Sequence, residues 1–395
     1  MAVKALGIVT SGNRIKVEGM QAFRPVSAFT FVGRYRMIDF PLSNLSNSNI
    51  ERIQVFAGAN PRSLAEHVGT GRHYGINSKR GKIQLLFSPE SEVNEIYNTD
   101  IASFLYNEDV IERVNTEYVI LVPSYMVFAQ NYEDLLDAHI ASGADITLLY
   151  HKVDNADVAY MNCEYLKLDD EKTVLGIQTN IGGKANKNIF MNSYIMKKDL
   201  FLELIKEAKK TSSMYNLFNI VNDKAAKEEL NIKGIQHEGY FEAITDFKSY
   251  FRANLELTDY ATAASLFTEK WPIYTRTNDA CPTQYLPGAS VKKSLISNGS
   301  LIAGTVENCI IGRGVVIEEG AVVKNSVICS EVTIAAGTVI ENQVVDKYAN
   351  ILHAKEIIAD PENPAPWRAS RRTRSAASSS TRCGRRATPG SSCGP

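Results

Sequence analysis

The stretch ISNGSLIAGTVENCIIGRGVVIEEGAVVKNSVICSEVTIAAGTVIENQVV, residues 296–345, decides the fold of the C-terminal part of the chain. Aliphatic residues recur in it every six positions, in three groups separated by single slips: Ile296 and Ile302; Ile311, Ile317 and Val323; Ile328, Ile334 and Ile340. Glycines stand between many of these positions. Such a repeat is typical of a β-helix made of short parallel strands with inward aliphatic side chains. A run of β-hairpins, the alternative, would not keep this period over such a length.

Upstream of the repeat, short apolar runs alternate with helical patterns. The runs are 3–9, 53–57, 118–122 and 146–150; the helical patterns are 41–50, 99–114 and 132–141; strand–helix passages follow at 187–208 and 215–229. This alternation predicts an α/β domain with a mostly parallel sheet. We therefore divide the chain into an α/β domain (1–258), a linker (259–290), a β-helix (291–355) and a tail (362–395).

The net charge hides two unlike segments. The 395 residues carry 43 Lys and Arg against 44 Asp and Glu, a formal charge of −1. Residues 363–395 hold seven Arg and no Lys, Asp or Glu, so the rest of the chain stands at −8. The tail is either a basic arm or, as its composition favours, a disordered and non-native end. The balanced charge gives no support for nucleic-acid binding, and no run of about 18 apolar residues predicts a membrane span.

The six cysteines predict neither a disulfide framework nor a metal site. None forms a C-x-x-C pair, and no histidine stands at zinc-ligand spacing from them. Free thiols in a chain of this size fit a reducing cytoplasm, which is the localisation we expect.

A candidate phosphate-binding turn follows the first apolar run. It reads SGNRIK and contains Ser11, Gly12, Arg14 and Lys16. Backbone N–H groups of such a turn can face a polyphosphate at the start of an α/β domain. With one glycine, a plain strand-to-helix turn remains an equal alternative.

Arginines gather in the next twenty residues. Arg24, Arg34 and Arg36 stand beside aromatic residues, and guanidinium groups in such a setting bind phosphate bidentately. The alternative is a solvated loop whose charges pair with Asp39 or Glu51.

The block at 33–44 (GRYRMIDFPLSN), followed by NSNI at 47–50, resembles the glucose-1-phosphate adenylyltransferases. The resemblance extends through WPIY at 271–274 and into the hexad repeat, covering roughly residues 3–352. It implies a Rossmann-like nucleotidyltransferase domain, a left-handed β-helix, and a tetramer that makes ADP-glucose for glycogen synthesis.

The chain departs from the family pattern in its nucleotide-binding segments. The family loop G-G-x-G-x-R matches SGNRIK, which loses two glycines and keeps the final positive charge as Lys16. The family lysine in R-A-K-P-A-V is Val26, and G-T-A-D-A becomes NTDIA at 98–102. The sugar-phosphate lysine matches Asn180 in a less secure alignment.

The metal positions depart as well. The two family aspartates that hold Mg²⁺ match Tyr125 and Ala243, neither of which supplies a hard carboxylate oxygen. Asp246 or Glu242 could shift in to replace one ligand. Without both, the Lewis acid of the transfer is lost, so we expect no catalytic residue, no metal and no cofactor in this chain.

The resemblance implies a GlgD-type regulatory subunit. Arg24 and Arg36 match family positions that contact phosphorylated effectors, although Thr30 and Phe23 replace other basic positions. The expected partners are a catalytic subunit, which holds Mg²⁺, in a heterotetramer, and a phosphorylated-sugar or nucleotide effector. Alternatives are an active nucleotidyltransferase with a rewired metal site, a sugar-phosphate sensor without a catalytic partner, and a β-helix acyltransferase. An acyltransferase of that kind needs a catalytic histidine on the coils, and residues 290–352 contain no histidine.

Overall fold

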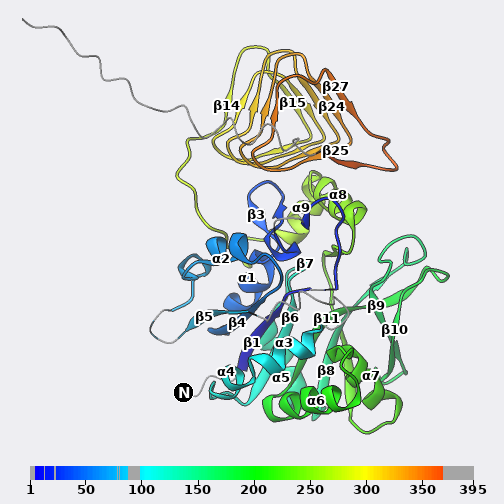
Figure 1. Ribbon diagram of the computed structural model, residues 1–395. Coiled ribbons are helices and arrows are strands. Elements are labelled where there is room, and N and C mark those ends of the chain that lie inside the picture. The colour runs from blue at the N-terminus through cyan, green and yellow to red at the C-terminus, as the bar shows by residue number, and fades with distance from the viewer. Residues whose placement is uncertain are drawn as a thin grey trace, which may run out of the picture.

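The structure, a computed structural model, describes residues 5–12, 14–21, 24–77, 79, 81–87 and 98–367. It contains an α/β part and a β-helix, and Figure 1 shows the β-helix at one end of the α/β part, with β3, α8 and α9 at the junction. The predicted fold, a mixed and mostly parallel sheet followed by a left-handed parallel β-helix of hexapeptide repeats, is confirmed.

A nine-stranded sheet forms the centre of the α/β part. Its strands are β1 (Ala5–Thr10), β4 (Arg52–Ala57), β5 (Lys82–Phe87), β6 (Tyr118–Pro123), β8 (Ile146–Val153), β9 (Glu164–Leu168), β10 (Val174–Thr179), β11 (Lys187–Lys197) and β12 (Ile232–Gln236). The main path runs β10-β9-β11-β6-β1-β4-β5, and β8 pairs with β11 and β12. Strands β1, β4, β5 and β6 are parallel, as are β8 and β12, whereas β11 is antiparallel to its neighbours.

Two hydrophobic cores cover the two faces of this sheet. Along β1, Leu6 and Ile8 belong to one core, and Ala5 and Val9 belong to the other. Successive side chains of a strand point to opposite faces, so the apolar run of β1 supplies both cores.

The helices cross between the strands or lie at the junction. They are α1 (Asp39–Asn47), α2 (Arg62–Val68), α3 (Asp100–Tyr106), α4 (Glu108–Glu112), α5 (Tyr132–Ser142), α6 (Lys198–Thr211), α7 (Leu217–Ala226), α8 (Phe247–Glu256) and α9 (Tyr260–Leu266), with 3-10 turns η2 (Val26–Ala28) and η3 (Arg72–Tyr74). The single helix predicted at 99–114 is broken at Asn107, whose side-chain amide donates to the carbonyls of Ser103 (3.0 Å) and Phe87 (3.2 Å). Such local hydrogen bonds compete with the helix.

Two small antiparallel pairs complete this part: β2 (Thr30–Phe31) with β3 (Tyr35–Arg36), and β7 (Met126–Phe128) with β13 (Phe241–Ala243). The turn between β2 and β3 lies against the β-helix. A Cβ at Gly33, which has φ +73°, would stand 2.6 Å from Ser297 Oγ and 2.7 Å from the Ile311 carbonyl oxygen. Only glycine allows this approach.

The β-helix has three parallel five-stranded sheets. The first holds β14 (Gln284–Tyr285), β17 (Leu301–Ile302), β20 (Val316–Ile317), β23 (Thr333–Ile334) and β26 (Asn350–Ile351). The second holds β15 (Ser290–Lys292), β18 (Thr305–Glu307), β21 (Val322–Lys324), β24 (Val339–Glu341) and β27 (Glu356–Ile358). The third holds β16 (Leu295–Ile296), β19 (Ile310–Ile311), β22 (Val327–Ile328), β25 (Gln343–Val345) and β28 (Ala365–Trp367). Most of the aliphatic residues of the repeat are buried inside these coils.

The β-helix is longer than the predicted 291–355. It begins at Gln284, and the predicted linker 259–290 contains α9 and the first strands. Part of the predicted tail also belongs to it, because Pro366 and Trp367 pair with Val344 and Val345. Residues 363–367 lack the aliphatic repeat, and pairing with the preceding coil together with the packing of Trp367 against the core places them. The remainder of the tail, 368–395, lies outside the described residues.

Candidate functional site

The first candidate site is a cavity of about 300 Å³ beyond the C-terminal end of β1. The predicted loop residues Ser11, Gly12, Arg14 and Lys16 line it. Thr10 and Ile15 of the same segment also line it, and the other lining residues come from six further segments: Asp100, Leu121, Tyr125, Asn162, Cys163, Glu164, Asn192, Tyr194, Asn216, Leu217, Phe218 and Thr245. The end of a parallel strand at the start of an α/β sheet is where such folds bind ligands.

The aromatic ring of Tyr125 covers the glycine of the loop. A Cβ at Gly12, which has φ +66°, would lie 2.8 Å from Tyr125 Cδ1. Tyr125 is 8% exposed, and Asn192 Nδ2 donates a 2.8 Å hydrogen bond to its hydroxyl oxygen. Burial, aided by Glu164, raises the pKa of Tyr125 well above its usual value. A neutral ring therefore occupies the direction in which a side chain at position 12 would project.

The charge of Arg14 is paired inside the cavity. Its Nη1 lies 2.8 Å from Glu164 Oε1, and its guanidinium group stacks 4.5 Å above the centre of the Phe218 ring. Asn192 Nδ2 also donates to the other carboxylate oxygen of Glu164, at 3.2 Å. The Glu164 side chain is only 5% exposed. The Arg14 side chain itself remains 45% exposed.

A second carboxylate, that of Asp100, lies where helices α3 and α7 begin. Its Oδ1 accepts from the N–H groups of Leu217 (3.0 Å) and Ile101 (2.7 Å). Burial raises the pKa of Asp100 to about 6, even though these donors lower it. In the sequence, Asp100 stands out only as a departure from the family motif. The helix-cap pattern Thr99–Asp100 is the signal that could have placed it at the start of a helix.

The two positions matched to the family's metal ligands come together. Ala243 ends β13 and pairs with Met126, and the Ile244 N–H donates to the Tyr125 carbonyl oxygen at 2.9 Å. Their side chains, a buried phenol and a methyl group, offer Mg²⁺ no carboxylate ligand. No cluster of three or more His, Cys, Asp or Glu able to hold a metal occurs in the part of the chain that the structure describes. The residues present do not fit this ion.

The two acidic residues that could replace the missing ligands are engaged elsewhere. Asp246 caps α8, and its Oδ1 accepts from the Ser249 N–H at 2.7 Å. Glu242 pairs with Arg252, whose Nη2 lies 3.1 Å from its Oε2, and burial raises the pKa of Glu242 to about 7. Neither residue lines the cavity.

The other matched positions are also away from the cavity. Val26 is buried in the core within η2. Asn180 is fully buried and donates to the carbonyl oxygens of Ala156 and Tyr160 (both 2.9 Å), while Lys187 Nζ donates to its Oδ1. Asn180 therefore holds a loop together.

The second candidate site lies at the junction with the β-helix. Arg24, whose side chain is 9% exposed, forms a two-bond ion pair with Asp346: Nη2–Oδ1 is 2.6 Å and Nη1–Oδ2 is 3.4 Å. Arg36 Nη1 donates to Ser63 Oγ at 2.7 Å and to the Ser63 carbonyl oxygen at 3.1 Å. Among the described residues, no carboxylate pairs with the Arg36 side chain. The structure therefore places both predicted effector residues beside one β-helix loop.

Lys347, which the sequence did not single out, completes this cationic cluster. Burial, and next the nearby charge of Arg36, lower the pKa of Lys347 to about 8. We call Arg24, Arg36, Asp346 and Lys347 the junction cluster. Asp346 and Lys347 follow β25 as an ordinary turn, and nothing local in the sequence shows that the α/β part contacts them.

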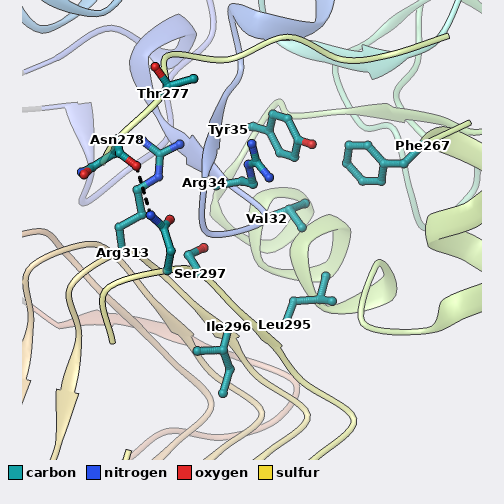
Figure 2. Close-up of a pocket in the computed structure, with 11 residues that line it drawn as sticks. Val32, Arg34, Tyr35, Phe267, Thr277, Asn278, Leu295, Ile296, Ser297 and Arg313 are labelled. Atoms are coloured by element: carbon teal, nitrogen blue, oxygen red, sulfur yellow. Dashed lines mark hydrogen bonds between the residues drawn. The ribbon is translucent and has the colours of Figure 1, made fainter. Parts of the chain in front are cut away.

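A second hollow of about 470 Å³ lies at the same junction, between the β2–β3 turn and the first coils of the β-helix. Figure 2 shows Arg34 on its α/β side and Arg313 on its β-helix side. Arg313 Nη2 donates to the Arg276 carbonyl oxygen at 3.0 Å, but its buried Nε has no partner among the described residues. Burial and the charge of Arg34 lower the pKa of Arg313. None of the described residues that line this hollow is acidic.

Fold and site together define a nucleotidyltransferase-type α/β domain joined to a hexapeptide β-helix. The nucleotidyl transferase family profile matches residues 22–260, and the profile described as GlmU-like, C-terminal hexapeptide matches residues 284–374. The chain is similar to the glucose-1-phosphate adenylyltransferases of Lachnospira eligens (30% identity over 78% of this chain and 72% of that one) and Thermosipho africanus (30% over 79% and 75%). It is also similar to the glycogen biosynthesis protein GlgD of Geobacillus stearothermophilus (31% over 81% and 83%). The chain belongs to the glucose-1-phosphate adenylyltransferase family, and this confirms the resemblance.

The helices of the described residues are short compared with a membrane span. None of them is long and apolar enough to cross a bilayer.

Proposed function

We propose that this chain is a regulatory, catalytically impaired subunit of a glucose-1-phosphate adenylyltransferase. In this role it supports the synthesis of ADP-glucose and pyrophosphate from ATP and glucose 1-phosphate for glycogen biosynthesis. Relatives that carry the enzyme's name and one named for glycogen biosynthesis support this assignment.

The observation that carries the proposal is the state of the two metal-ligand positions. Tyr125 and Ala243 lie together at the end of the sheet, yet neither offers an oxygen that holds Mg²⁺. A metal ion supplies the Lewis acid and template of phosphoryl-type transfer. A chain without it keeps the fold but loses most of the transition-state stabilisation. The Mg²⁺ that the reaction needs belongs, in this proposal, to a catalytic partner subunit in a heterotetramer.

The junction cluster supports the regulatory half of the proposal. Its three cations lie near two carboxylates, Asp346 and the Asp39 whose charge acts on Arg36, so cations remain in excess next to both parts of the molecule. A phosphorylated sugar or nucleotide effector would pair with Arg36 and Lys347 and compete with Asp346 for Arg24. The arginine-lined hollow of Figure 2 adds positive charge to the same junction.

An effector at the junction can act on a partner because it touches two packed parts. Arg24 and Arg36 belong to the α/β part, whereas Lys347 belongs to the β-helix. Ligand binding shifts a conformational equilibrium only when its affinity differs between the two states. In our proposal, the effector strengthens the contact between the α/β part and the β-helix. The resulting position of the β-helix then changes the activity of the partner subunit.

The active-enzyme alternative would need Asp246 or Glu242 at the metal. Moving Asp246 would remove the cap of α8, and moving Glu242 would remove the two contacts that its carboxylate makes with Arg252, leaving that arginine with Glu256 alone. Each change costs stability, so the geometry does not favour this alternative.

The experiment mixes the purified chain with a catalytic glucose-1-phosphate adenylyltransferase subunit. We expect a complex by native mass measurement and a changed maximal rate or activator response. Replacing Arg24 and Arg36 together with glutamine is expected to abolish the changed activator response while the complex remains.

The matched control replaces the exposed Arg62 and Arg113 with glutamine, which removes the same charge elsewhere. It should behave as the unmodified chain. If no complex forms and neither the rate nor the activator response changes, the regulatory proposal is contradicted. The alternative that remains is a sugar-phosphate sensor that has no catalytic partner. Dissociation of the complex by the Arg24 and Arg36 changes would make them interface residues instead.

A further inference from the structure

The second sheet of the β-helix carries two regular columns of side chains on its outer face. The middle residues of three of its strands, Val306, Val323 and Ile340, are buried inside the coils. Because successive side chains of a strand alternate between faces, the residues on either side of them point outward. The register stacks these outward residues in two columns: Ser290, Thr305, Val322, Val339 and Glu356; and Lys292, Glu307, Lys324, Glu341 and Ile358.

The second of these columns begins with charges of alternating sign. We call Lys292, Glu307, Lys324 and Glu341 the charge column. Neighbouring strands lie about 4.8 Å apart, so the charge column spans about 14 Å. No ion pair or side-chain hydrogen bond links any of these side chains to another residue in the described part of the chain. Their charges are therefore not committed to partners within the fold.

The second sheet is not packed against the α/β part, in contrast to the third. On the third sheet, the outer side chains of Ile310, Val327 and Val344 belong to a hydrophobic core of the α/β part. Val322 and Val339 on the second sheet are half-buried and belong to none of the cores formed by the described residues. Figure 1 shows β15, β24 and β27 on a side of the β-helix that is turned away from the α/β part. The second sheet therefore presents an apolar stripe beside the charge column.

Alternating charges make this face complementary to itself in one orientation. A two-fold axis that runs along the strands brings two copies face to face and reverses the column. Lys292 of one copy then faces Glu341 of the other, and Glu307 faces Lys324. A two-fold axis along the column would instead place each charge opposite its own like, which is unfavourable. In the reversed orientation, Val322 faces Thr305 of the second copy, so the apolar stripes also meet.

We propose that the second sheet docks against the same sheet of a second copy of this chain, with the charge columns reversed. The inference goes beyond the proposed function, because the contact needs no catalytic subunit. In a heterotetramer it would join two copies of this chain. The face is small, and exposed ion pairs contribute little each. We therefore expect a weak contact, with a dissociation constant on the order of 10–100 µM.

The experiment measures self-association of the full chain by sedimentation velocity up to about 300 µM. Lys292→Glu with Lys324→Glu makes the charge column wholly acidic, and Glu307→Lys with Glu341→Lys makes it wholly basic. Each variant alone should associate at least about tenfold more weakly than the unmodified chain. An equimolar mixture of the two should regain the association, because every charge then meets its opposite.

A second variant tests the orientation. Exchanging all four charges, with Lys292→Glu, Glu307→Lys, Lys324→Glu and Glu341→Lys, keeps the alternation but inverts its sign. This variant should associate with itself as the unmodified chain does, and a fluorescently labelled sample of it should not associate with the unmodified chain. It also serves if a two-site variant does not fold, because it retains two charges of each sign.

The matched control is Lys184→Glu with Lys209→Glu, which makes the same change of charge at exposed positions elsewhere. It should associate as the unmodified chain does.

The alternative is that the charges pair only within their own column, which would stabilise the coils without joining two copies. Unchanged association of the acidic and basic variants would favour that alternative and overturn the proposal. So would the absence of association by the unmodified chain, or a mixture that fails to regain it. Association of the four-site variant with the unmodified chain would overturn the reversed orientation. None of these results touches the regulatory proposal, which is tested by mixing with a catalytic subunit.

Discussion

The cavity beyond β1 and the junction with the β-helix both contain arginines of the N-terminal segment, but they treat the charge in opposite ways. In the cavity, Arg14 is paired with the buried Glu164. At the junction, the Arg36 side chain forms no ion pair with a carboxylate among the described residues, although the charge of Asp39 acts on it, and none of the described residues that line the hollow beside Arg34 and Arg313 is acidic. A neutralised cation cannot attract phosphate, whereas an excess of cations can. The comparison shows a cation paired with a buried carboxylate in the cavity and a surplus of cations at the junction, so we expect anions to bind more tightly at the junction.

The largest expected effect comes from restoring carboxylates at the metal positions. Tyr125→Asp with Ala243→Asp buries two unpaired charges and should lower the free energy of unfolding by about 3–5 kcal/mol in the absence of metal. Because β7 and β13 hold the two positions together, binding of Mg²⁺ or Mn²⁺ to the two new carboxylates should restore part of the lost stability. Urea unfolding with and without the metal measures both effects.

The control for this change is Tyr125→Asn with Ala243→Asn, which has similar size and no charge. It should show no dependence on metal. If the unmodified chain itself gains stability from Mg²⁺, the cavity does hold the ion and the comparison fails.

The second effect concerns the ion pair of the junction cluster. Asp346→Asn leaves the Arg24 guanidinium buried without its counterion and should lower the free energy of unfolding by about 2 kcal/mol, less than for a fully buried pair because Asp346 is a quarter exposed. A double-mutant cycle with Arg24→Met measures the interaction energy of the ion pair separately from the effect of each substitution on its surroundings. Glu66→Gln, in the exposed pair with Arg62, should cost nothing measurable; an equal loss there would remove the distinction between the two pairs.

The third effect is a dependence on pH at Lys347. Its pKa of about 8 in the folded chain lies below the ordinary 10.5, so the unfolded chain binds more protons between these values. The free energy of unfolding should therefore rise as the pH increases from 8 toward 10.5. Sulfate stays a dianion throughout, and its affinity for the junction should fall severalfold from pH 7 to pH 9 as Lys347 loses its charge.

Lys347→Arg tests the cause, because the guanidinium remains charged in this range. The affinity for sulfate should then be flat with pH. A pH dependence that survives this substitution would assign the titration to another group.

The smallest effect tests how firmly the ring of Tyr125 is held. Tyr125→Phe removes the hydrogen bond from Asn192 and should cost about 1 kcal/mol of stability. Tyr106→Phe, at an exposed position, is the control. Equal effects of the two substitutions in chemical unfolding would show that Asn192 does not hold the ring.

Much of this architecture could be predicted from the sequence, because periodicity reports which side chains point inward. The six-residue repeat predicted the coils, and the apolar runs predicted β1, β6 and β8. The ends of the β-helix lie beyond the predicted ones, since its last strand falls in a segment rich in Pro and Ala, where pairing with Gln343–Val345 and the packing of Trp367 against the core hold it in place. A pattern that depends on side-chain period cannot show a strand fixed by its neighbour.

The sites were less predictable than the fold. The family resemblance pointed to Tyr125, Ala243, Arg24 and Arg36 as positions worth inspecting. It could not show that Glu164 pairs with Arg14, because these residues are 150 positions apart and meet only through the sheet. The partnership of Arg24 with Asp346, 322 positions away, is likewise a property of the packed junction.

The most direct test of the central claim is the release of pyrophosphate from ATP and glucose 1-phosphate in the presence of Mg²⁺. It is measured for the chain alone, for a catalytic subunit alone, and for their mixture at equal total concentration. The account predicts no release above background by the chain alone, and a changed maximal rate or activator response in the mixture. Release by the chain alone at a rate similar to that of the catalytic subunit would contradict it.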